Sequence, residues 1–361
     1  MNNQIYLNRQ NLLRQRMERD GLSTFLVTHL PNVRYLCGFS GSHALLLVGM
    51  EKTVIISDGR YQEQIEREIV GAAFILQGQR RDTAAVAEML ADFPPGKVGF
   101  ESHHLSVSRH TALSEARPDR DFVAATDYVE DLRIEKDDGE IDLIRQAVGI
   151  AEHAFEKVLG TIREGMTERE LGHLLEDLMW QAGAETESFE TLVLFGARTS
   201  LPHGKPGDTA LAMGEPILMD FGCVWQGYCS DITRTVFLGD PGEEYREAYL
   251  LVQEAQQKGT NAVQPDVPCR EADAAARAVF NGRGRGDQFL HSLGHGVGLE
   301  IHEAPRLAPT EEKPLRAGTV VTVEPGIYVA GWGGIRIENM VVARAGGPET
   351  LNRTSTEMIV L

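Results

Sequence analysis

The chain lacks several features that would place it in a large protein class. Its 361 residues include only four cysteines, and Cys37, Cys223, Cys229 and Cys269 show no spacing typical of a metal site. A set this sparse fits a reducing compartment, so we expect buried, free thiols and a cytoplasmic protein. Residues 1–25 carry several charges and no long apolar run, so we expect neither a signal peptide nor a membrane span.

Positive charge is also scarce. Lys and Arg number 35 against 53 Asp and Glu, which gives a formal net charge of −18. A protein of this sign repels polyanions, so we expect no nucleic-acid partner and no membrane partner. The apolar content of 42% and the charged content of 24% are ordinary for a globular enzyme.

The length exceeds that of one typical core, and the sequence pattern changes near residue 130. Residues 1–130 alternate short β-branched runs with helix-compatible segments, which is typical of an α/β layer domain. Strands are expected at 24–28, 44–48, 53–57 and 97–100, and helices at 59–69 and 82–93. A charged, turn-prone run at 131–140 then predicts a second domain over 131–361.

The second domain begins with two predicted helices. Apolar residues from Ile141 to Val158 recur at three- and four-residue steps, and Thr167 with Glu170 forms a capping-box pair at the start of the next helix. Similar helices are expected near 243–258 and 270–280. This spacing indicates a duplicated unit of two helices followed by strands.

A predicted β-hairpin brings two aspartates together. Gln226 and Gly227 suit a two-residue turn between two strand-like segments. The turn pairs Gly222 with Asp231, and Asp220 then lies on the same face, one diagonal step of about 7 to 8 Å away. Carboxylates so close usually share a proton or bind cations, although two exposed turn acids remain the alternative.

Three more polar residues have unusual settings. His295 is flanked by glycines, which disfavour a helix and let a ligand approach closely. Glu324 ends an apolar strand, and Glu338 alternates with Ile335 and Ile337 in another. Such charges are costly to bury unless paired or metal-bound, and a salt bridge of Glu338 is the alternative. Four carboxylates and one imidazole together predict a hydrolytic site with two divalent cations.

These segments together resemble the pita-bread metallopeptidases, the family of methionine aminopeptidase, Xaa-Pro aminopeptidase and prolidase. The motifs are Met-Asp-Phe-Gly at 219–222, Ser-Asp-Ile-Thr-Arg-Thr at 230–235, Gly-His-Gly-Val-Gly at 294–298, Glu-Pro-Gly-Ile-Tyr at 324–328 and Arg-Ile-Glu-Asn at 336–339. The resemblance covers essentially the whole chain. It implies an α+β fold, with a creatinase-like α/β N-terminal domain before a pita-bread catalytic domain whose duplicated helix-helix-strand unit surrounds a curved antiparallel sheet.

The resemblance also implies two divalent metal ions, with manganese preferred over cobalt or zinc. Asp220 would bind one ion and His295 with Glu324 the other, while Asp231 and Glu338 would bridge both. A carboxylate can bridge because it is multidentate, whereas an imidazole cannot. Glu324 would also carry the proton from the attacking water to the leaving nitrogen.

Further residues of the chain match the family's substrate contacts. His203 and His302 match residues that contact the substrate and the transition state, and His291 and Arg336 match the proline-specific branch. The resemblance therefore implies peptide substrates with proline at the second position. Tyr228 either lines the entrance or packs in the interior.

Several alternatives stay open. Arg336 is either a substrate contact or a structural partner of Glu338. The uncharged segment 35–42 resembles aminopeptidase P and offers no group to bind a free dipeptide carboxylate, so Xaa-Pro aminopeptidase is favoured over the alternative, prolidase. The family implies a homodimer. A non-catalytic peptide- or protein-binding member of the fold is the alternative from another class, but such relatives have lost ligands that this chain retains.

Overall fold

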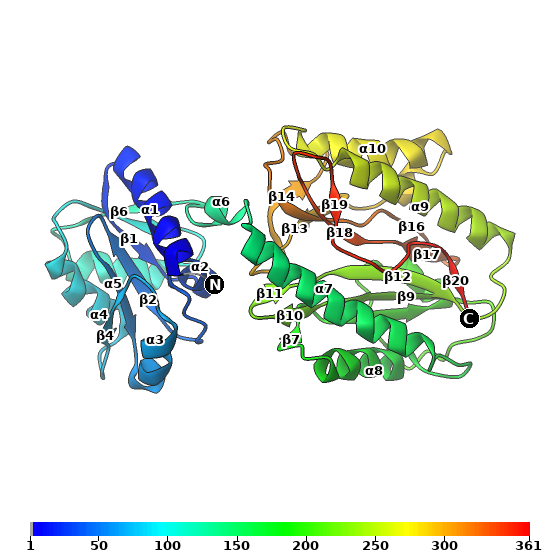
Figure 1. Cartoon of the computed structure of the whole chain (residues 1–361), viewed down its shortest axis with the longest axis horizontal. Coiled ribbons are helices and arrows are strands. Elements are labelled where there is room, and N and C mark those ends of the chain that lie inside the picture. The colour runs from blue at the N-terminus through cyan, green and yellow to red at the C-terminus, as the bar shows by residue number, and fades with distance from the viewer. Residues whose placement is uncertain (1–2) are drawn as a thin grey trace. The chain divides into compact units, whose positions relative to one another are not determined.

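The computed structural model describes residues 3–361 and divides the chain into two compact units, Met1–Arg133 and Ile134–Leu361 (Figure 1). Each unit has buried apolar clusters of its own. All four cysteines are buried and free, as expected. Within residues 3–361, no helix combines the length and apolar content needed to cross a membrane.

The N-terminal unit is a six-stranded mixed sheet with helices, which confirms the expected α/β layer. The strand order is β4-β3-β2-β1-β5-β6. The strands are β1 (Leu22–Val27), β2 (Leu45–Gly49), β3 (Thr53–Ser57), β4 (Ala73–Leu76), β5 (Lys97–Glu101) and β6 (Asp121–Ala125). The helices are α1 (Asn3–Arg19), α2 (Leu30–Cys37), α3 (Gln62–Glu68), α4 (Asp82–Met89), α5 (Val107–Ala116) and α6 (Glu130–Arg133).

The strands that sequence patterning missed are the two edge strands. β2 and β3 are buried along their whole length, whereas β4 and β6 consist only of exposed and half-buried residues. An edge strand has fewer neighbours, so its sequence needs no continuous apolar run. The helix expected over 82–93 ends at Met89, and a 3₁₀ turn, η2 (Leu90–Asp92), follows it.

The C-terminal unit, Ile134–Leu361, contains two long helix pairs, each matching a predicted pair. They are α7 (Asp138–Leu159) with α8 (Glu168–Gln181), and α9 (Glu243–Ala262) with α10 (Cys269–Gly282). Capping boxes begin α7 and α8, and each satisfies backbone N–H groups at the helix start. The apolar faces of these helices then pack against the sheets.

Two sheets lie between the helix pairs, with orders β20-β12-β9-β8 and β14-β13-β15-β18-β19. All neighbouring pairs within them are antiparallel except β12 with β20. The strands of the unit are β7 (Thr186–Glu187), β8 (Leu192–Phe195), β9 (Pro216–Phe221), β10 (Cys223–Trp225), β11 (Tyr228–Cys229), β12 (Ile232–Phe237), β13 (Gly294–Gly296), β14 (Glu303–Leu307), β15 (Val320–Val323), β16 (Gly326–Val329), β17 (Gly333–Arg336), β18 (Asn339–Val342), β19 (Glu349–Thr350) and β20 (Ile359–Val360). The 3₁₀ turns are η3 (Gly196–Ser200) and η4 (Gly286–Gln288).

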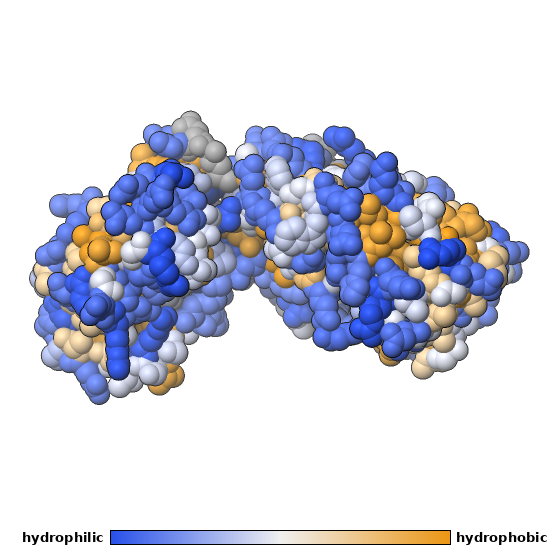
Figure 2. Space-filling model, turned by 90° about the horizontal axis from the view of Figure 1, so that it is seen from below, coloured by the Kyte–Doolittle hydropathy of each residue, from blue (hydrophilic) through white to orange (hydrophobic). Residues whose placement is uncertain are grey.

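The predicted duplication is confirmed by the packing. One apolar cluster joins α7 and α8 to the β8, β9 and β12 strands, and another joins α9 and α10 to β15, β16 and β17. In Figure 1, α7 and α8 run along one side of the strands and α9 and α10 along the other. The face of each unit seen in Figure 2 is mainly hydrophilic with small apolar patches, in keeping with the net charge of −18.

Candidate metal centre

The first half of the C-terminal unit supplies two aspartates from one hairpin. Thr233 pairs with Asp220 in the β9–β12 ladder, which is the register that the predicted turn requires. Gln226 and Gly227 have φ values of 45° and 80°, the left-handed conformation of a type I′ turn. The tight turn therefore fixes Asp220 and the buried Asp231 on one face of the hairpin.

The second half supplies a histidine from a glycine-rich strand. His295 is the middle residue of β13, which lies between β14 and β15, so the expectation that the flanking glycines disfavour a helix is confirmed. A Cβ on Gly294 would lie 2.0 Å from the Thr322 carbonyl oxygen, and one on Gly296 would lie 2.4 Å from that of Ala304. Only glycine allows backbones to approach so closely on both sides of the imidazole.

Glu324 and Glu338 lie where strands are interrupted. Glu324 follows β15, and Pro325 separates it from β16. The continuous strand expected around Glu338 is instead broken between β17 and β18. The break arises because the Glu338 N–H bonds to the Thr233 carbonyl at 3.1 Å, across to the other half, while Thr233 Oγ1 donates to Glu338 Oε2 at 2.6 Å.

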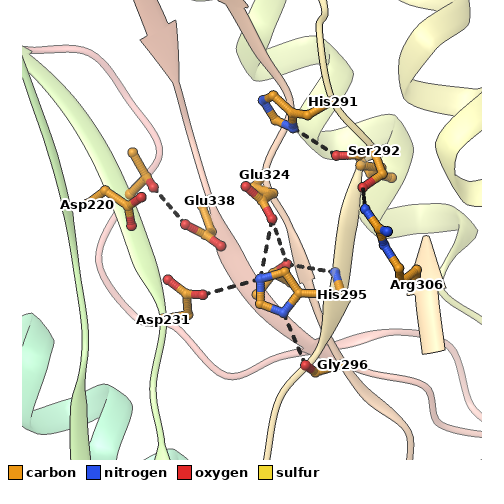
Figure 3. Close-up of polar contacts among 12 residues, drawn as sticks. Asp220, Asp231, His291, Ser292, His295, Gly296, Arg306, Glu324 and Glu338 are labelled. Carbon is orange, nitrogen blue, oxygen red and sulfur yellow. Dashed lines mark hydrogen bonds and ion pairs between the residues drawn. The ribbon is translucent and has the colours of Figure 1, made fainter. Parts of the chain in front are cut away.

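The predicted ligand side chains converge on one place, as Figure 3 shows. Carboxylate oxygens of Asp220, Asp231 and Glu338 all lie within 4.8 Å of one another. His295 Nε2 lies 3.6 Å from Asp231 Oδ2 and 3.6 Å from Glu324 Oε1. The fold thus gathers the four acids and the imidazole that the sequence singled out.

This concentration of acids is electrostatically unfavourable without added positive charge. Burial, followed by the charges of neighbouring acids, raises the pKa values of Asp231 and Glu338 well above their ordinary range. Burial likewise raises the pKa of Glu324 to about 7, and the charge of Asp220 adds to the effect. Carboxylates held this way favour either protons or cations.

The imidazole is neutral and oriented toward the acids. Burial, together with the positive charges of His302 and Arg306, lowers the pKa of His295 to about 4. Its Nδ1 lies 3.1 Å from the Gly296 carbonyl oxygen, which places the proton on Nδ1. The Nε2 lone pair is then left to face Asp231 and Glu324, as a metal ligand requires.

The residues present fit divalent cations. Asp220 Oδ1 is buried and receives no hydrogen bond from any group in residues 3–361. The donor set is oxygen-rich with one nitrogen and no thiolate, which suits manganese, cobalt or zinc. A cation beside this orphaned oxygen would satisfy it and offset the repulsion among Asp220, Asp231 and Glu338.

Arg336 is a structural partner of the acids, but of a different acid from the one expected. It is 3% exposed, and its guanidinium donates to Asp220 Oδ2, to Thr233 Oγ1 at 3.0 Å and to the Tyr328 hydroxyl at 2.8 Å. The alternative that paired it with Glu338 is therefore corrected to Asp220. Each guanidinium nitrogen thus donates to a group of the centre, which supports the structural role, while a contact with substrate stays a prediction.

His291 joins this network through Tyr328, which the sequence reasoning missed. His291 Nδ1 lies 2.8 Å from the Ser292 carbonyl oxygen, and Nε2 lies 2.9 Å from the Tyr328 hydroxyl. Burial, together with the charge of Arg336, lowers the pKa of His291 to about 4. Tyr328 thus donates to His291 and accepts from Arg336. Its signal was its place at the end of the Glu-Pro-Gly-Ile-Tyr motif.

His203 and His302 are exposed and lie beside the centre. The His302 ring lies 4.3 Å from that of His295 between centroids, and burial with the nearby Arg306 charge lowers its pKa. His203 is near enough for its charge to act on both His291 and His302. Arg306, which pairs with His295 in the β13–β14 ladder, was missed, although strand alternation in 303–307 could have indicated it.

Tyr228 does not line an entrance. It is 2% exposed, and its hydroxyl donates to Glu140 Oε1 at 2.9 Å, inside the apolar cluster beneath α7. Glu140 belongs to the capping box of α7. Tyr228 therefore packs in the interior, and its prediction as a substrate contact is corrected.

Comparison with known proteins covers both units. The family description Metallopeptidase family M24 matches residues 142–345, and Creatinase/Prolidase N-terminal domain matches residues 9–134. The chain is 35% identical to a Xaa-Pro dipeptidase of Pyrococcus furiosus over 345 residues, which are 95% of this chain and 97% of that protein.

Two solved structures are similar along almost the whole chain. A Xaa-Pro dipeptidase from Bacillus anthracis superposes with a TM-score of 0.95 at 37% identity, covering 99% of this chain and 100% of that one. An X-Pro aminopeptidase from Thermotoga maritima superposes with a TM-score of 0.89 at 36% identity, covering 98% of this chain and 99% of that one. The similar scores do not distinguish the two kinds of peptidase.

Proposed function

The chain belongs to metallopeptidase family M24, and from this premise we propose that it is a metal-dependent exopeptidase cleaving the bond between an N-terminal residue and a following proline. The observation that carries the proposal is the convergence of Asp220, Asp231 and Glu338 within 4.8 Å, beside the neutral imidazole of His295. The names of the relatives, Xaa-Pro dipeptidase and X-Pro aminopeptidase, support proline-containing substrates. We favour the aminopeptidase.

The centre is proposed to hold two divalent cations, manganese by preference and cobalt or zinc otherwise. Asp220 would hold one, His295 with Glu324 the other, and the multidentate Asp231 and Glu338 both. Bound cations would supply Lewis-acid activation of a water molecule and of the scissile carbonyl.

The chain's own residues would orient the substrate and move the proton. Glu324 would take the proton of the attacking water and return it to the leaving nitrogen, a role that suits a carboxyl whose pKa burial raises to about 7. The exposed His203 and His302 would donate to the tetrahedral oxyanion, at about 3 to 4 kcal/mol each. His291 and Tyr328 would border the proline, whose preceding peptide bond has no N–H to recognise.

One observation favours the alternative, a Xaa-Pro dipeptidase. Arg306 is exposed, lies 3.4 Å from Ser292 Oγ and is close enough to lower the pKa values of His295 and His302. A dipeptide carries its free carboxylate one residue beyond the scissile bond, and a guanidinium can bind it bidentately. Segment 35–42 lacks such a group, but Arg306 supplies one.

Comparing a Xaa-Pro dipeptide with a Xaa-Pro-Xaa tripeptide tests the branch. The aminopeptidase proposal expects efficient cleavage of the tripeptide, with little change in Arg306→Gln. Cleavage of the dipeptide alone, with KM raised in Arg306→Gln, would replace it with the dipeptidase. Arg283→Gln removes an exposed arginine from the turn after α10 and serves as the matched control.

Chelation tests the metal and with it the class of protein. Removing bound ions should abolish hydrolysis, and Mn²⁺ should restore it, with two ions per chain in the active form. Hydrolysis that persists without metal would contradict the proposal, and an inactive protein that still binds Xaa-Pro peptides would indicate the non-catalytic alternative. We further propose that the protein is a homodimer. We also propose that it is cytoplasmic, and the free, buried cysteines support this compartment.

A further inference from the structure

The histidines that flank the centre lie on irregular loops. His203 lies in segment 201–215, between η3 and β9, and His291 lies in segment 289–293, between η4 and β13. Such segments have no ladder of their own to fix their side chains. In both cases a buried carboxylate, paired with a partly exposed arginine, binds the loop backbone.

In the second half, Asp273 and Arg277 on α10 bind the loop of His291. Asp273 is 1% exposed and accepts both Arg277 Nε at 2.8 Å and Nη2 at 2.9 Å, while its Oδ1 also accepts the Leu293 N–H at 3.0 Å. Arg277 in turn donates to the carbonyl oxygens of His291 at 2.9 Å and Phe289 at 3.2 Å. The pair therefore fixes the backbone on both sides of the imidazole.

In the first half, Glu168 and Arg198 bind the loop of His203. Glu168 opens α8, is 0% exposed and accepts the Phe195 N–H at 3.0 Å and the Gly207 N–H at 2.8 Å. Its oxygens also accept Arg198 Nε at 2.9 and 3.1 Å. Arg198 then donates to the Lys205 carbonyl oxygen at 2.8 Å. The pair thus holds the loop at Lys205 and Gly207, directly after its histidine, and ties it to β8 through Phe195.

We propose that Glu168–Arg198 and Asp273–Arg277 are positioning pairs, each holding one histidine-bearing loop so that its imidazole faces the substrate. This inference rests on the proposed function. The arginine follows the acid by 30 residues in the first pair and by four in the second, yet each pair binds loop amides and carbonyls in the same way. The two halves therefore meet one requirement with different residues.

The first test uses full-length, metal-loaded protein carrying Asp273→Asn or Arg277→Lys. Glu312→Gln is the matched control. Glu312 forms an exposed ion pair with Arg270, which lies on α10 as Asp273 does. We expect kcat/KM for a Xaa-Pro-Xaa peptide to fall on the order of 10- to 100-fold in Asp273→Asn, since a small displacement of a substrate-facing group is enough. Arg277→Lys keeps the positive charge but loses the guanidinium that binds Asp273 through two nitrogens, so its fall in kcat/KM should be smaller. Metal content should not change.

Double variants separate positioning from a general structural role. In a His291→Ala background, Asp273→Asn should lower kcat/KM little further. In a His203→Ala background, it should lower kcat/KM by its full factor. Glu168→Gln should show the opposite dependence on the two backgrounds. Equal losses in both backgrounds would overturn the inference. Arg277→Lys carries the test if Asp273→Asn does not fold.

The outcomes also separate this inference from the proposed function. A wild-type protein that cleaves no Xaa-Pro peptide contradicts the function itself. If wild type is active and His291→Ala is impaired, but both Asp273→Asn and Arg277→Lys match wild type, only the positioning role fails.

Discussion

Buried carboxylates occur in both units, but their surroundings differ. In the N-terminal unit, Glu101 is 3% exposed and accepts hydrogen bonds from the Thr28 N–H at 2.6 Å and from Asn32 Nδ2 at 2.7 Å. In the catalytic unit, Asp231 is 5% exposed and faces His295 at 3.6 Å and two other carboxylates within 4.8 Å. One acid is surrounded by donors and the other by acids.

The difference separates a structural acid from a functional one. Burial raises the pKa of both, but donors oppose the rise at Glu101, whereas three further acids add to it at Asp231. The protein's own N–H groups therefore satisfy the Glu101 carboxyl. Asp231 favours a bound proton or a cation, and a divalent cation would supply the missing charge. A buried acid without donors thus indicates a ligand site more specifically than burial alone.

Asp231→Asn should have the largest effect and would test this contrast directly. Hydrolysis should fall at least ~1,000-fold, because the loss of shared metal charge removes several kcal/mol of transition-state stabilisation. Metal-free Asp231→Asn should nevertheless unfold at a higher temperature than metal-free wild type, because one repelling charge is gone. Calorimetry with and without chelator measures this, with the exposed Asp208→Asn as control. A less stable metal-free variant would show that these acids do not repel one another.

Removing the cationic partner of a buried acid should lower stability, which is the opposite of the effect expected for metal-free Asp231→Asn. Lys136 and Glu303 form an ion pair at 3.1 Å, with side chains 1% and 6% exposed. Lys136→Met should destabilise the catalytic unit by about 3 to 5 kcal/mol, because it removes the ammonium that neutralises the buried Glu303 carboxylate. Lys136→Met with Glu303→Leu should recover most of that loss in denaturant unfolding. A single-variant cost below about 1 kcal/mol would mean that the pair is solvated and the contrast too simple.

The ligand set was predictable because much of it is fixed locally. The turn at Gln226 and Gly227 sets the register that joins Asp220 to Asp231, and glycines mark the close approach around His295. These signals lie within a few residues of the ligands themselves. The convergence of both halves was predictable only from the joint pattern of motifs.

What sequence could not predict is the choice among chemically equal partners. Arg336 lies two residues from Glu338, yet it pairs with Asp220, 116 residues away. Both are acids, and only the placement of β17 against β9 decides between them. Tyr228 shows the same limit, since an aromatic residue before a ligand strand suits either an entrance or a core. The positioning pairs were missed because they join helices to distant loops.

A pH titration tests whether protonated histidines beside the centre, in place of a cation, neutralise its buried acids. Burial lowers the pKa of His291 from 6.5 to about 4, so between these values the unfolded chain binds a proton that the folded protein does not. Stability should therefore fall as the pH falls from 6.5 to 4, and this residue should account for about 3 kcal/mol of the loss. Over the same pH range, the free energy of unfolding of His291→Ala should fall by about 3 kcal/mol less than that of His203→Ala. Equal pH dependence would mean that His291 is already protonated in the folded protein.

Glu101→Gln should have the smallest effect and remain within the N-terminal unit. Its new amide group would face Asn32 Nδ2, and Asn32 cannot turn over, because Nδ2 also donates to Glu130 at 2.6 Å and Oδ1 accepts from Arg133 at 2.7 Å. We expect a cost of about 1 to 3 kcal/mol in unfolding of that unit, against no change in the exposed Glu115→Gln. Metal content should stay that of wild type. An unchanged or more stable Glu101→Gln would mean that Glu101 is already protonated, and the contrast with Asp231 would then lie in cation binding and not in the state of the buried acid.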